Sequence, residues 1–384
     1  MIPEACLYLA APEDSSAARF SIAGRPVAFR VVMAAVRAGI GRVRVPAILR
    51  DPALEALIAR TPSARAAVAW LDLGAAMPTG DVLLLPATMH VTASSLKPLL
   101  AIDGVRCLAG LPDDRPVGVT TGSALAPLWE SLVGSRPVGV ALTHVLAKAG
   151  AARLAADPVV LPVTDAATAA EAEVRLYRTL GTAIDSPLDR AFHRRLSQPL
   201  TRWAVAHDIA PNTITVASIV CGLGAALAAG SDGMGGVLAA LALYAVAVVL
   251  DHSDGEVARV SFTESRFGEW LDLGADTLVH VTLVLALGIT ADRLTGRGAG
   301  WGLIAAVGVL ASTWTARTSA PADAGVGRFF GTLGNRDGFY GMLIGFATVI
   351  AAWPAALPGY MVFVGVGTHA YWVGNALTRR RGAR

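Results

Sequence analysis

The sequence predicts a two-domain protein in which an N-terminal α/β domain precedes an all-α bundle of six transmembrane helices. Three observations lead to this fold class. The chain has 384 residues, which is enough for two domains. Short apolar runs alternate with helical stretches over the first 170 residues, and six apolar spans follow. We expect the α/β domain over residues 1–170, a linker with an amphipathic juxtamembrane helix over residues 171–210, and the membrane domain over residues 211–384.

The composition limits the classes of function. Hydrophobic residues make up 54% of the chain, and the formal net charge of +3 is too small to indicate a nucleic-acid partner. The three cysteines, Cys6, Cys107 and Cys221, follow no disulfide or metal-binding spacing. The first residues lack the basic and then apolar pattern of a signal peptide, so we expect residues 1–200 in the cytoplasm. The bias toward Ala, Arg and Gly is typical of proteins from bacteria with a high GC content.

In the N-terminal domain, apolar runs of strand length recur between helical stretches. We expect strands at Ala5–Ala10, Arg42–Val45, Ala67–Leu71, Val82–Leu85, Val105–Ala109 and Val159–Val163. We expect helices at Val27–Ala38, Ala53–Arg60 and Ser123–Leu132. This alternation favours a mostly parallel, Rossmann-like sheet with helices on both faces.

The linker is expected to contain a helix that lies at the membrane surface. Glu171–Leu180 is predicted to be a charged helix, and Ser186 with Pro187 forms a typical helix cap and first-turn pair. Over residues 188–205, apolar side chains recur at helical spacing between arginines. This pattern predicts an amphipathic helix at the interface, and an ordinary linker helix is the alternative.

Six apolar spans follow the linker. They are Ile214–Gly230, Gly235–Leu250, Trp270–Ile289, Gly300–Ala316, Phe339–Trp353 and Gly359–Leu377. Several are shorter than the roughly 20 residues of a simple membrane span, so polar flanks must complete them. The segment ends on one side carry most of the arginines, namely Arg194, Arg195, Arg202, Arg259, Arg266, Arg317, Arg328, Arg336 and Arg379–Arg381. The positive-inside rule therefore puts the N-terminal domain, the aspartates described next and the C-terminus on the cytoplasmic side of a bacterial inner membrane.

One polar segment interrupts these apolar spans. Residues 251–276 read DHSDGEVARVSFTESRFGEWLDLGAD and contain four aspartates, Asp251, Asp254, Asp272 and Asp276. An ionised Asp near the bilayer centre costs roughly 2.5–3.5 kcal/mol, so four of them need a compensating partner. Each half of the segment carries two aspartates on one helix face, and the polar stretch between them is expected to be a turn between antiparallel helices. The carboxylates predict a site for a hard divalent cation, and helix-end acids that face water are the alternative.

The same segment resembles a family signature. The pattern D-x-x-D-G-x-x-A-R, eight residues, G-x-x-x-D-x-x-x-D is that of the CDP-alcohol phosphotransferases. This chain fills every fixed position, with Asp251, Asp254, Gly255, Ala258, Arg259, Gly268, Asp272 and Asp276. The resemblance implies an enzyme of phospholipid biosynthesis that moves a phospho-alcohol group from a CDP-alcohol to an acceptor hydroxyl and releases CMP. It also implies six transmembrane helices, one or two Mg²⁺ or Mn²⁺ ions, and a homodimer in contact with membrane lipids.

The resemblance further implies roles for single residues. Asp251, Asp254, Asp272 and Asp276 would bind the metal, and Asp276 would also be the base that takes the acceptor's proton. A CDP-binding role is implied for Gly255, Ala258, Arg259, Gly268, Asn212 and Thr215, the last two through a Pro-Asn-x-x-Thr step at the first span. An acceptor-binding role is expected for Arg317, Arg328 and Arg336, which lie between the fourth and fifth spans.

At the start of the chain, residues 7–11 read LYLAA, residues 23–27 read AGRPV and residues 38–43 read AGIGRV. This order resembles the opening of nucleotidyltransferases. Some relatives of the membrane domain carry a cytidylyltransferase there, which makes the CDP-alcohol. Residues 12–20, PEDSSAARF, begin with acidic residues and contain no Gly where that family has a Gly-rich phosphate loop. Residues 86–90, PATMH, supply no acidic metal ligand after the Val82–Leu85 strand. We therefore expect a degenerate nucleotidyltransferase-like domain, and a bifunctional enzyme is the alternative.

The donor and the acceptor stay open at this point. A joined nucleotidyltransferase-like domain is typical of enzymes that use CDP-inositol, whereas degeneracy of that domain makes CDP-diacylglycerol comparably plausible. A non-catalytic membrane scaffold is a third hypothesis, against which the complete set of eight motif residues argues.

Overall fold

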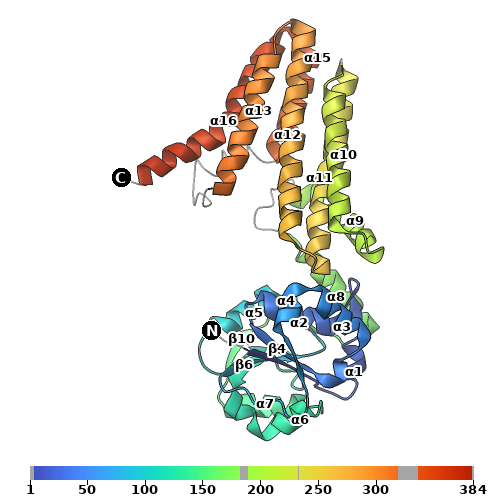
Figure 1. Cartoon of the computed structure of the whole chain (residues 1–384), viewed down its shortest axis with the longest axis vertical. Coiled ribbons are helices and arrows are strands. Elements are labelled where there is room, and N and C mark those ends of the chain that lie inside the picture. Colours follow the sequence, from blue (N-terminus) through green and yellow to red (C-terminus); the bar gives the residue numbers. More distant parts are fainter. Residues whose placement is uncertain (1–3, 182–188, 232, 319–335, 383–384) are drawn as a thin grey trace. The chain divides into compact units, whose positions relative to one another are not determined.

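The computed structural model describes residues 4–181, 189–231, 233–318 and 336–382. Contacts divide the chain into two compact units, Met1–Leu180 and Gly181–Arg384, of which the first is α/β and the second helical (Figure 1). Ser186, Pro187 and Arg328, which the sequence analysis singles out, lie outside the described residues.

A seven-stranded sheet forms the centre of the N-terminal unit, in the order β10-β8-β9-β6-β1-β4-β5. Its strands are β1 (Glu4–Tyr8), β4 (Arg42–Pro46), β5 (Val68–Leu71), β6 (Asp81–Pro86), β8 (Arg106–Ala109), β9 (Gly118–Thr121) and β10 (Ala152–Ala155). β9 runs antiparallel to both β6 and β8, and the other neighbouring pairs are parallel. Two short antiparallel ladders form separately, β2 (Ser21–Ile22) with β3 (Arg25–Pro26) and β7 (Met89–His90) with β11 (Leu161–Pro162).

Helices cover both faces of this sheet (Figure 1). On one face α2 (Val27–Arg37), which is buried along most of its length, packs against β4, and α4 (Pro62–Ala67) and α5 (Ala93–Leu100) pack beside it. On the other face η2 (Gly122–Leu128), α6 (Trp129–Val133) and α7 (Gly139–Lys148) bury Leu125, Leu132 and Leu142 against Tyr8 and Leu84. The shorter helices of this unit are α1 (Asp14–Ala17), η1 (Ala47–Leu49) and α3 (Pro52–Arg60).

The last helix of this unit, α8 (Ala166–Arg178), begins at a capping box in which Asp165 accepts from the backbone of Thr168. It includes most of the predicted charged helix at Glu171–Leu180. Its buried residues include Leu176 and Tyr177, and Glu173 accepts a 2.6 Å hydrogen bond from the backbone N–H of Ala23. The charged helix is thus packed as part of the N-terminal unit.

The predicted α/β architecture is confirmed, but two element predictions are wrong in detail and two strands were not predicted. Val159–Val163 supplies only the two-residue β11, which pairs outside the main sheet. The first half of the helix expected at Ser123–Leu132 is a 3-10 turn that contains Pro127, whose missing N–H weakens helical bonding. β9 and β10 were not predicted, because Gly118–Thr121 and Ala152–Ala155 are too poor in large apolar residues to stand out.

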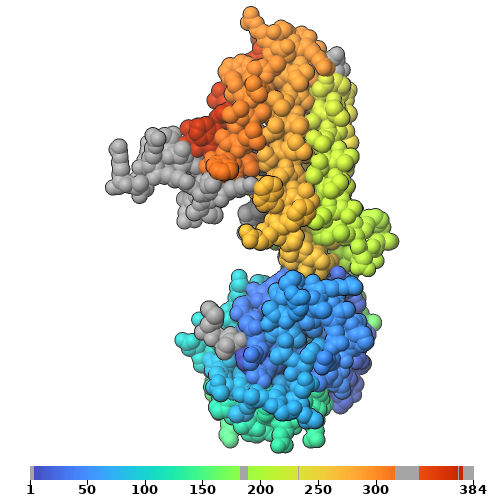
Figure 2. Space-filling view, in the orientation of Figure 1, coloured from blue at the N-terminus to red at the C-terminus, as the bar shows by residue number. Residues whose placement is uncertain are grey.

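The second unit contains helices and no strands over its described residues. Its elements are η3 (Asp189–His193), α9 (Arg194–Ala206), α10 (Pro211–Ala229), α11 (Met234–Ser261), α12 (Arg266–Thr295), α13 (Ala299–Thr318), α15 (Arg336–Ala352), η4 (Pro354–Ala356) and α16 (Leu357–Gly382). α10 packs against both α11 and α12, and α13 packs against α12 and α16. Figure 2 shows α10, α12 and α13 side by side on one face of this unit. The core includes Val237, Tyr244, Leu283, Leu287 and Phe346.

Helices coincide with all six predicted apolar spans. Three of them, α10, α11 and α12, are long and apolar enough to cross a membrane. The apolar parts of α13 and α15 are shorter, Ala299–Thr315 and Asp337–Ala352, over the described residues. Large apolar side chains such as Leu227, Leu303 and Phe363 are mostly exposed, which is typical of surfaces that face lipid.

Residues 189–206 form a helix with one polar and one apolar side. The turn η3 has π-helical hydrogen bonding and continues into α9. Phe192, Leu196 and Trp203 are about half exposed, whereas Arg194 and Ser197 are buried. The buried polar side faces α11, as the hydrogen bonds described below establish.

Candidate functional site

The motif aspartates lie where two long helices reverse direction. α11 ends at Ser261, and Phe262 caps it in a left-handed conformation with φ 59°. α12 begins after Ser265, whose side chain accepts a 3.0 Å hydrogen bond from the backbone N–H of Gly268. This short connection, together with α10 packed against both helices, positions the carboxylates of the two halves of the motif.

Three of the four predicted metal ligands converge. Carboxylate oxygens of Asp251, Asp254 and Asp272 all lie within 4.8 Å of one another. Asp251 and Asp254 are only 8% and 5% exposed. Three negative charges in such a place repel one another and have lost hydration, so a cation among them lowers their energy. Because all the ligand atoms are carboxylate oxygens, these residues fit Mg²⁺ or Mn²⁺.

Asp254 is held in place by a residue of α10. The hydroxyl of Thr215 donates a 2.6 Å hydrogen bond to Oδ2 of Asp254, and both side chains are buried. Asn212 lies one turn earlier on α10, with its Oδ1 3.4 Å from the point that a Cβ on Gly268 would occupy. The two residues of the Pro-Asn-x-x-Thr step thus both lie beside the motif.

Asp276 lies one helical turn beyond Asp272. It lines a small pocket together with Asp251, Ser218, Tyr244 and His280, and it is partly exposed. The Tyr244 hydroxyl and His280 Nε2 are 2.9 Å apart and form one wall of this pocket. A carboxylate that borders both a pocket and the aspartate cluster is in a position to accept a proton from a bound hydroxyl group.

Arg259 folds back along α11 over Gly255. Its Nη1 lies 3.1 Å from the point that a Cβ on residue 255 would occupy, so the Gly leaves room for the guanidinium. Ala258 is partly buried beside it. A guanidinium within the motif suits a phosphate-bearing ligand, because its planar donors match phosphate oxygens.

The arginines predicted to bind the acceptor lie at helix ends or outside the described residues. Arg317 is in the last turn of α13, Arg336 is the first residue of α15, and Arg328 lies in the range that the structure leaves undescribed. Their acceptor-binding role stays a prediction.

Two polar residues inside the motif bind neighbouring segments of the chain, which the sequence did not predict. Glu256 is fully buried and accepts hydrogen bonds from Arg194, from Ser197 at 2.9 Å and from Thr201 at 2.6 Å. His252 lies 3.0 Å from Asp189 through its Nε2. The available signal was the spacing of Arg194, Ser197 and Thr201 at intervals of three and four, which puts them on one face of α9.

In the N-terminal unit, a buried carboxylate binds the backbone just after the first strand. Just after β1, the backbone N–H groups of Ala10 and Ala11 donate to Oδ2 of Asp14 at 2.8 and 3.3 Å. Arg115 Nη1 lies 2.8 Å from the same carboxylate and donates to Thr88 at 3.0 Å. Backbone N–H groups and an arginine, which are groups that can bind a phosphate, therefore bind the carboxylate of Asp14 instead.

Comparison with known proteins identifies the helical part. Residues 208–373 match the sequence profile of the family described as CDP-alcohol phosphatidyltransferase. The chain is 36% identical over 129 residues to a CDP-diacylglycerol--serine O-phosphatidyltransferase of Mycobacterium leprae, covering 34% of this chain and 42% of the relative. It is 34% identical over 130 residues to the protein of that name from Mycobacterium tuberculosis H37Rv, covering 34% of this chain and 44% of the relative.

A relative with a different name matches a shorter stretch. The chain is 33% identical over 104 residues to a bifunctional IPC transferase and DIPP synthase of Aquifex aeolicus, covering 27% of this chain and 23% of the relative. The chain thus spans less than half the length of each of these curated relatives. The matched range 208–373 contains the converging aspartates, so the resemblance stated from the motif is confirmed. Residues 208–373 therefore make up a CDP-alcohol phosphatidyltransferase domain.

Proposed function

We propose that this protein transfers a phospho-alcohol group from a CDP-alcohol to an acceptor hydroxyl at a membrane, with release of CMP, in phospholipid biosynthesis. The observation that carries the proposal is the convergence of Asp251, Asp254 and Asp272 within 4.8 Å in a domain of this family. A pyrophosphate-bearing donor needs cationic neutralisation, and these carboxylates are suited to hold the ion that supplies it.

In this mechanism each residue has a limited task. Asp251, Asp254 and Asp272 would hold Mg²⁺ or Mn²⁺, whose positive charge would neutralise the donor pyrophosphate. Thr215 fixes the orientation of Asp254 through their 2.6 Å hydrogen bond. Arg259 pairs with donor phosphate, and Gly255, Ala258 and Gly268 leave room for the CDP group near Asn212.

Asp276 acts as the base in the proposed reaction. The acceptor hydroxyl lies in the pocket that Asp276 shares with Asp251, and its proton passes to the Asp276 carboxylate. The hydroxyl oxygen forms a bond to the β-phosphorus of the donor, the bond from that phosphorus to the CMP oxygen breaks, and CMP leaves. Asp276 could also complete the metal site. Arg317, Arg328 and Arg336 would bind a charged acceptor.

The donor is the least constrained part of this proposal. The names of the mycobacterial relatives favour CDP-diacylglycerol as the donor. The Aquifex relative is named as a bifunctional enzyme with different activities, so its name does not favour that donor. CDP-inositol therefore stays the second donor to test. For the N-terminal unit we favour a degenerate, non-catalytic domain, because the backbone N–H group of Ala10 and the Arg115 guanidinium both bind the Asp14 carboxylate and not a free anion. A non-catalytic scaffold is the remaining alternative for the whole chain.

The membrane topology is part of the same proposal. The helices α10, α11, α12, α13, α15 and α16 would cross the bacterial inner membrane, with the N-terminal domain and the active site on the cytoplasmic side. We also propose that the chain forms a homodimer. The proposed domain ranges are 1–170, 171–210 and 211–384.

The experiment is a CMP-release assay on the purified full-length protein in detergent. CDP-diacylglycerol and CDP-inositol are each offered with polyol, polyol-phosphate and amino-alcohol acceptors, with and without Mg²⁺ or Mn²⁺. Metal-dependent CMP release with one pair is expected and identifies both substrates. A folded protein that neither binds CDP nor releases CMP from any pair would favour the scaffold. Pyrophosphate release from CTP and an alcohol phosphate would instead reveal an active N-terminal domain.

A further inference from the structure

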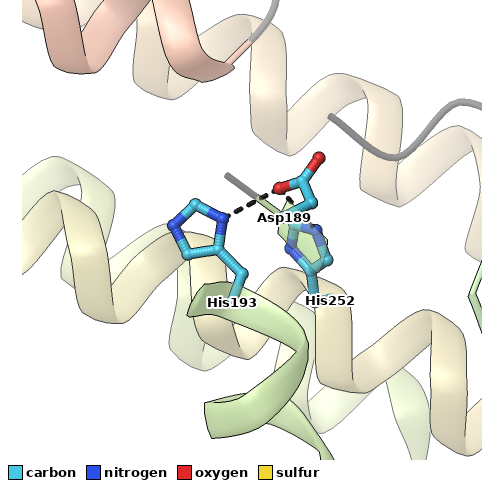
Figure 3. A group of neighbouring side chains, drawn as sticks. All are labelled: Asp189, His193 and His252. Atoms are coloured by element: carbon cyan, nitrogen blue, oxygen red, sulfur yellow. Dashed lines mark hydrogen bonds and ion pairs between the residues drawn. The ribbon is translucent and has the colours of Figure 1, made fainter. Parts of the chain in front are cut away.

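A second group of potential metal ligands lies next to the aspartate cluster, and the proposed reaction does not use it. Asp189 and His193 are the first and last residues of η3, and His252 comes from α11 (Figure 3). Oδ1 of Asp189 lies 2.8 Å from Nδ1 of His193 and 3.0 Å from Nε2 of His252. All three residues are at most 9% exposed. Two imidazole nitrogens and one carboxylate oxygen therefore converge on a buried point.

The outer nitrogen of His252 fixes the hydrogen on that ring. Nδ1 of His252 lies 2.8 Å from the carbonyl oxygen of Val248, and a carbonyl oxygen can only accept a hydrogen bond. Nδ1 therefore carries the hydrogen, and Nε2 of the neutral ring presents a lone pair to the carboxylate of Asp189. Two acceptors at 3.0 Å repel each other unless a cation, either a proton or a metal ion, lies with them.

A metal ion explains more of the arrangement than a proton does. Nε2 of His193 lies 3.1 Å from the Tyr340 hydroxyl, and the two rings stack at 5.5 Å. Both imidazoles thus have their outer nitrogens engaged and their inner nitrogens directed at Asp189, which is the arrangement of metal-bound histidines. A protonated His252 would explain the contact between His252 and Asp189. It would not require that the imidazole of His193 contact the same Asp189 oxygen.

We propose that Asp189, His193 and His252 bind a zinc ion. Two imidazole nitrogens and a carboxylate oxygen are a donor set that zinc accepts with a water as the fourth ligand, whereas Mg²⁺ prefers oxygen ligands alone. Ligand atoms around a tetrahedral zinc are about 3.3 Å apart, so the present separations must widen by a few tenths of an ångström on binding.

The proposed zinc joins η3 to α11 beside the aspartates. His252 is the neighbour of Asp251 in α11, and Glu256, one turn further, already binds three residues of α9. The ion would add a second connection between the same two segments and so fix the position of α11 at the site. This assignment does not depend on the proposed transferase activity, and either can fail without the other.

The test uses the full-length protein in detergent with excess Mg²⁺ to occupy the carboxylate cluster. After loading with zinc and removal of free metal, elemental mass spectrometry should find about one zinc per chain. His193→Ala and His252→Ala should each lose that zinc. His207→Ala, at an exposed histidine of the same region, and Asp272→Asn, in the other cluster, should keep it.

X-ray absorption at the zinc edge of the wild-type protein gives a second readout that needs no variant. Scattering from two imidazole rings is expected. A spectrum with oxygen ligands alone would contradict the assignment, as would a folded wild-type protein that retains no zinc. Zinc that persists in both His193→Ala and His252→Ala would also overturn it.

Discussion

Thr215 on α10 and Asp254 on α11 are joined by a buried 2.6 Å hydrogen bond. The bond uses one carboxylate oxygen of Asp254 and leaves the carboxylate oriented toward Asp251 and Asp272, within 4.8 Å of both. Hydrogen bonds of this kind fix the direction of a metal ligand and reduce the entropy that it loses on binding. The first span thus contributes to a site whose aspartates all come from the second and third.

Replacing Thr215 should weaken the metal site without removing a ligand. Thr215→Val keeps the shape of the side chain but deletes the donor to Asp254, and the apparent affinity for Mg²⁺ should fall about 10–100-fold. Thr215→Ser keeps the hydroxyl and should retain most of the Mg²⁺ affinity. Thr213→Val, at an exposed position two residues earlier, should leave that affinity unchanged. Mg²⁺ titration of CMP release measures this, and an unchanged Mg²⁺ requirement in Thr215→Val would contradict the role.

The contact between Arg194 and Glu256 should contribute most of the free energy that holds α9 against α11. Arg194→Met leaves a fully buried carboxylate with only the hydroxyls of Ser197 and Thr201, and loss of one partner of a buried ion pair costs about 3–5 kcal/mol. Arg195→Met, at an exposed neighbour, is the control. Thermal unfolding in detergent should show a lower midpoint for Arg194→Met and an unchanged midpoint for Arg195→Met. The double variant Arg194→Met with Glu256→Gln should regain part of the lost midpoint.

The close approach of α10 and α12 depends on Gly222. A Cβ at this residue would lie 2.4 Å from Cγ2 of Val279, so Gly222→Ala should destabilise the helical unit by about 1–3 kcal/mol. Gly224→Ala is the matched control, because a Cβ there would make an ordinary 3.6 Å contact with Leu243. The thermal midpoint should recover when Val279→Ala is added to Gly222→Ala. No recovery would mean that the clash with Val279 is not the cause.

The N-terminal unit should lose stability in mild acid through His90. Burial lowers the pKa of His90 to about 4, below the value of about 6.5 expected in the unfolded chain. The unfolded chain then binds more protons between these two values, so the stabilisation is complete above about pH 6.5 and is lost as the pH falls toward 4. Between pH 7 and pH 5 the loss should be about 2 kcal/mol.

Hydrogen exchange over β6 and β7 measures this effect in the full-length protein. Protection in the wild type should fall from pH 7 to pH 5 after correction for intrinsic rates. His90→Leu should remove that fall, since Leu fills the buried site without a titrating group. An equal fall in the wild type and in His90→Leu would exclude His90 as its origin.

The sequence predicted the elements that periodicity and hydropathy determine. All six apolar spans became helices, and the motif at residues 251–276 marked the aspartates and the turn between α11 and α12. These features depend on local sequence, so a single chain is enough to find them.

Contacts between distant segments could not be predicted in the same way. Glu256 looked like an unspecified position of the motif, and its partners on α9 lie 55 to 62 residues away. Asp189 and His252 are paired only because η3 packs against α11. The antiparallel β9 was missed because its pairing with β6 and β8 compensates for a weak strand sequence. Tertiary packing determines each of these cases.

The most direct test of the central claim is CMP release by Asp272→Asn compared with the wild type and with Asp292→Asn. Asp292 lies on the same helix, far from the motif in sequence, so its substitution controls for charge loss on α12. Asp272→Asn should lower the metal-dependent rate at least about 100-fold, because it removes one of three converging ligands, while Asp292→Asn should retain the wild-type rate. A folded Asp272→Asn protein with the wild-type rate and Mg²⁺ requirement would contradict the account.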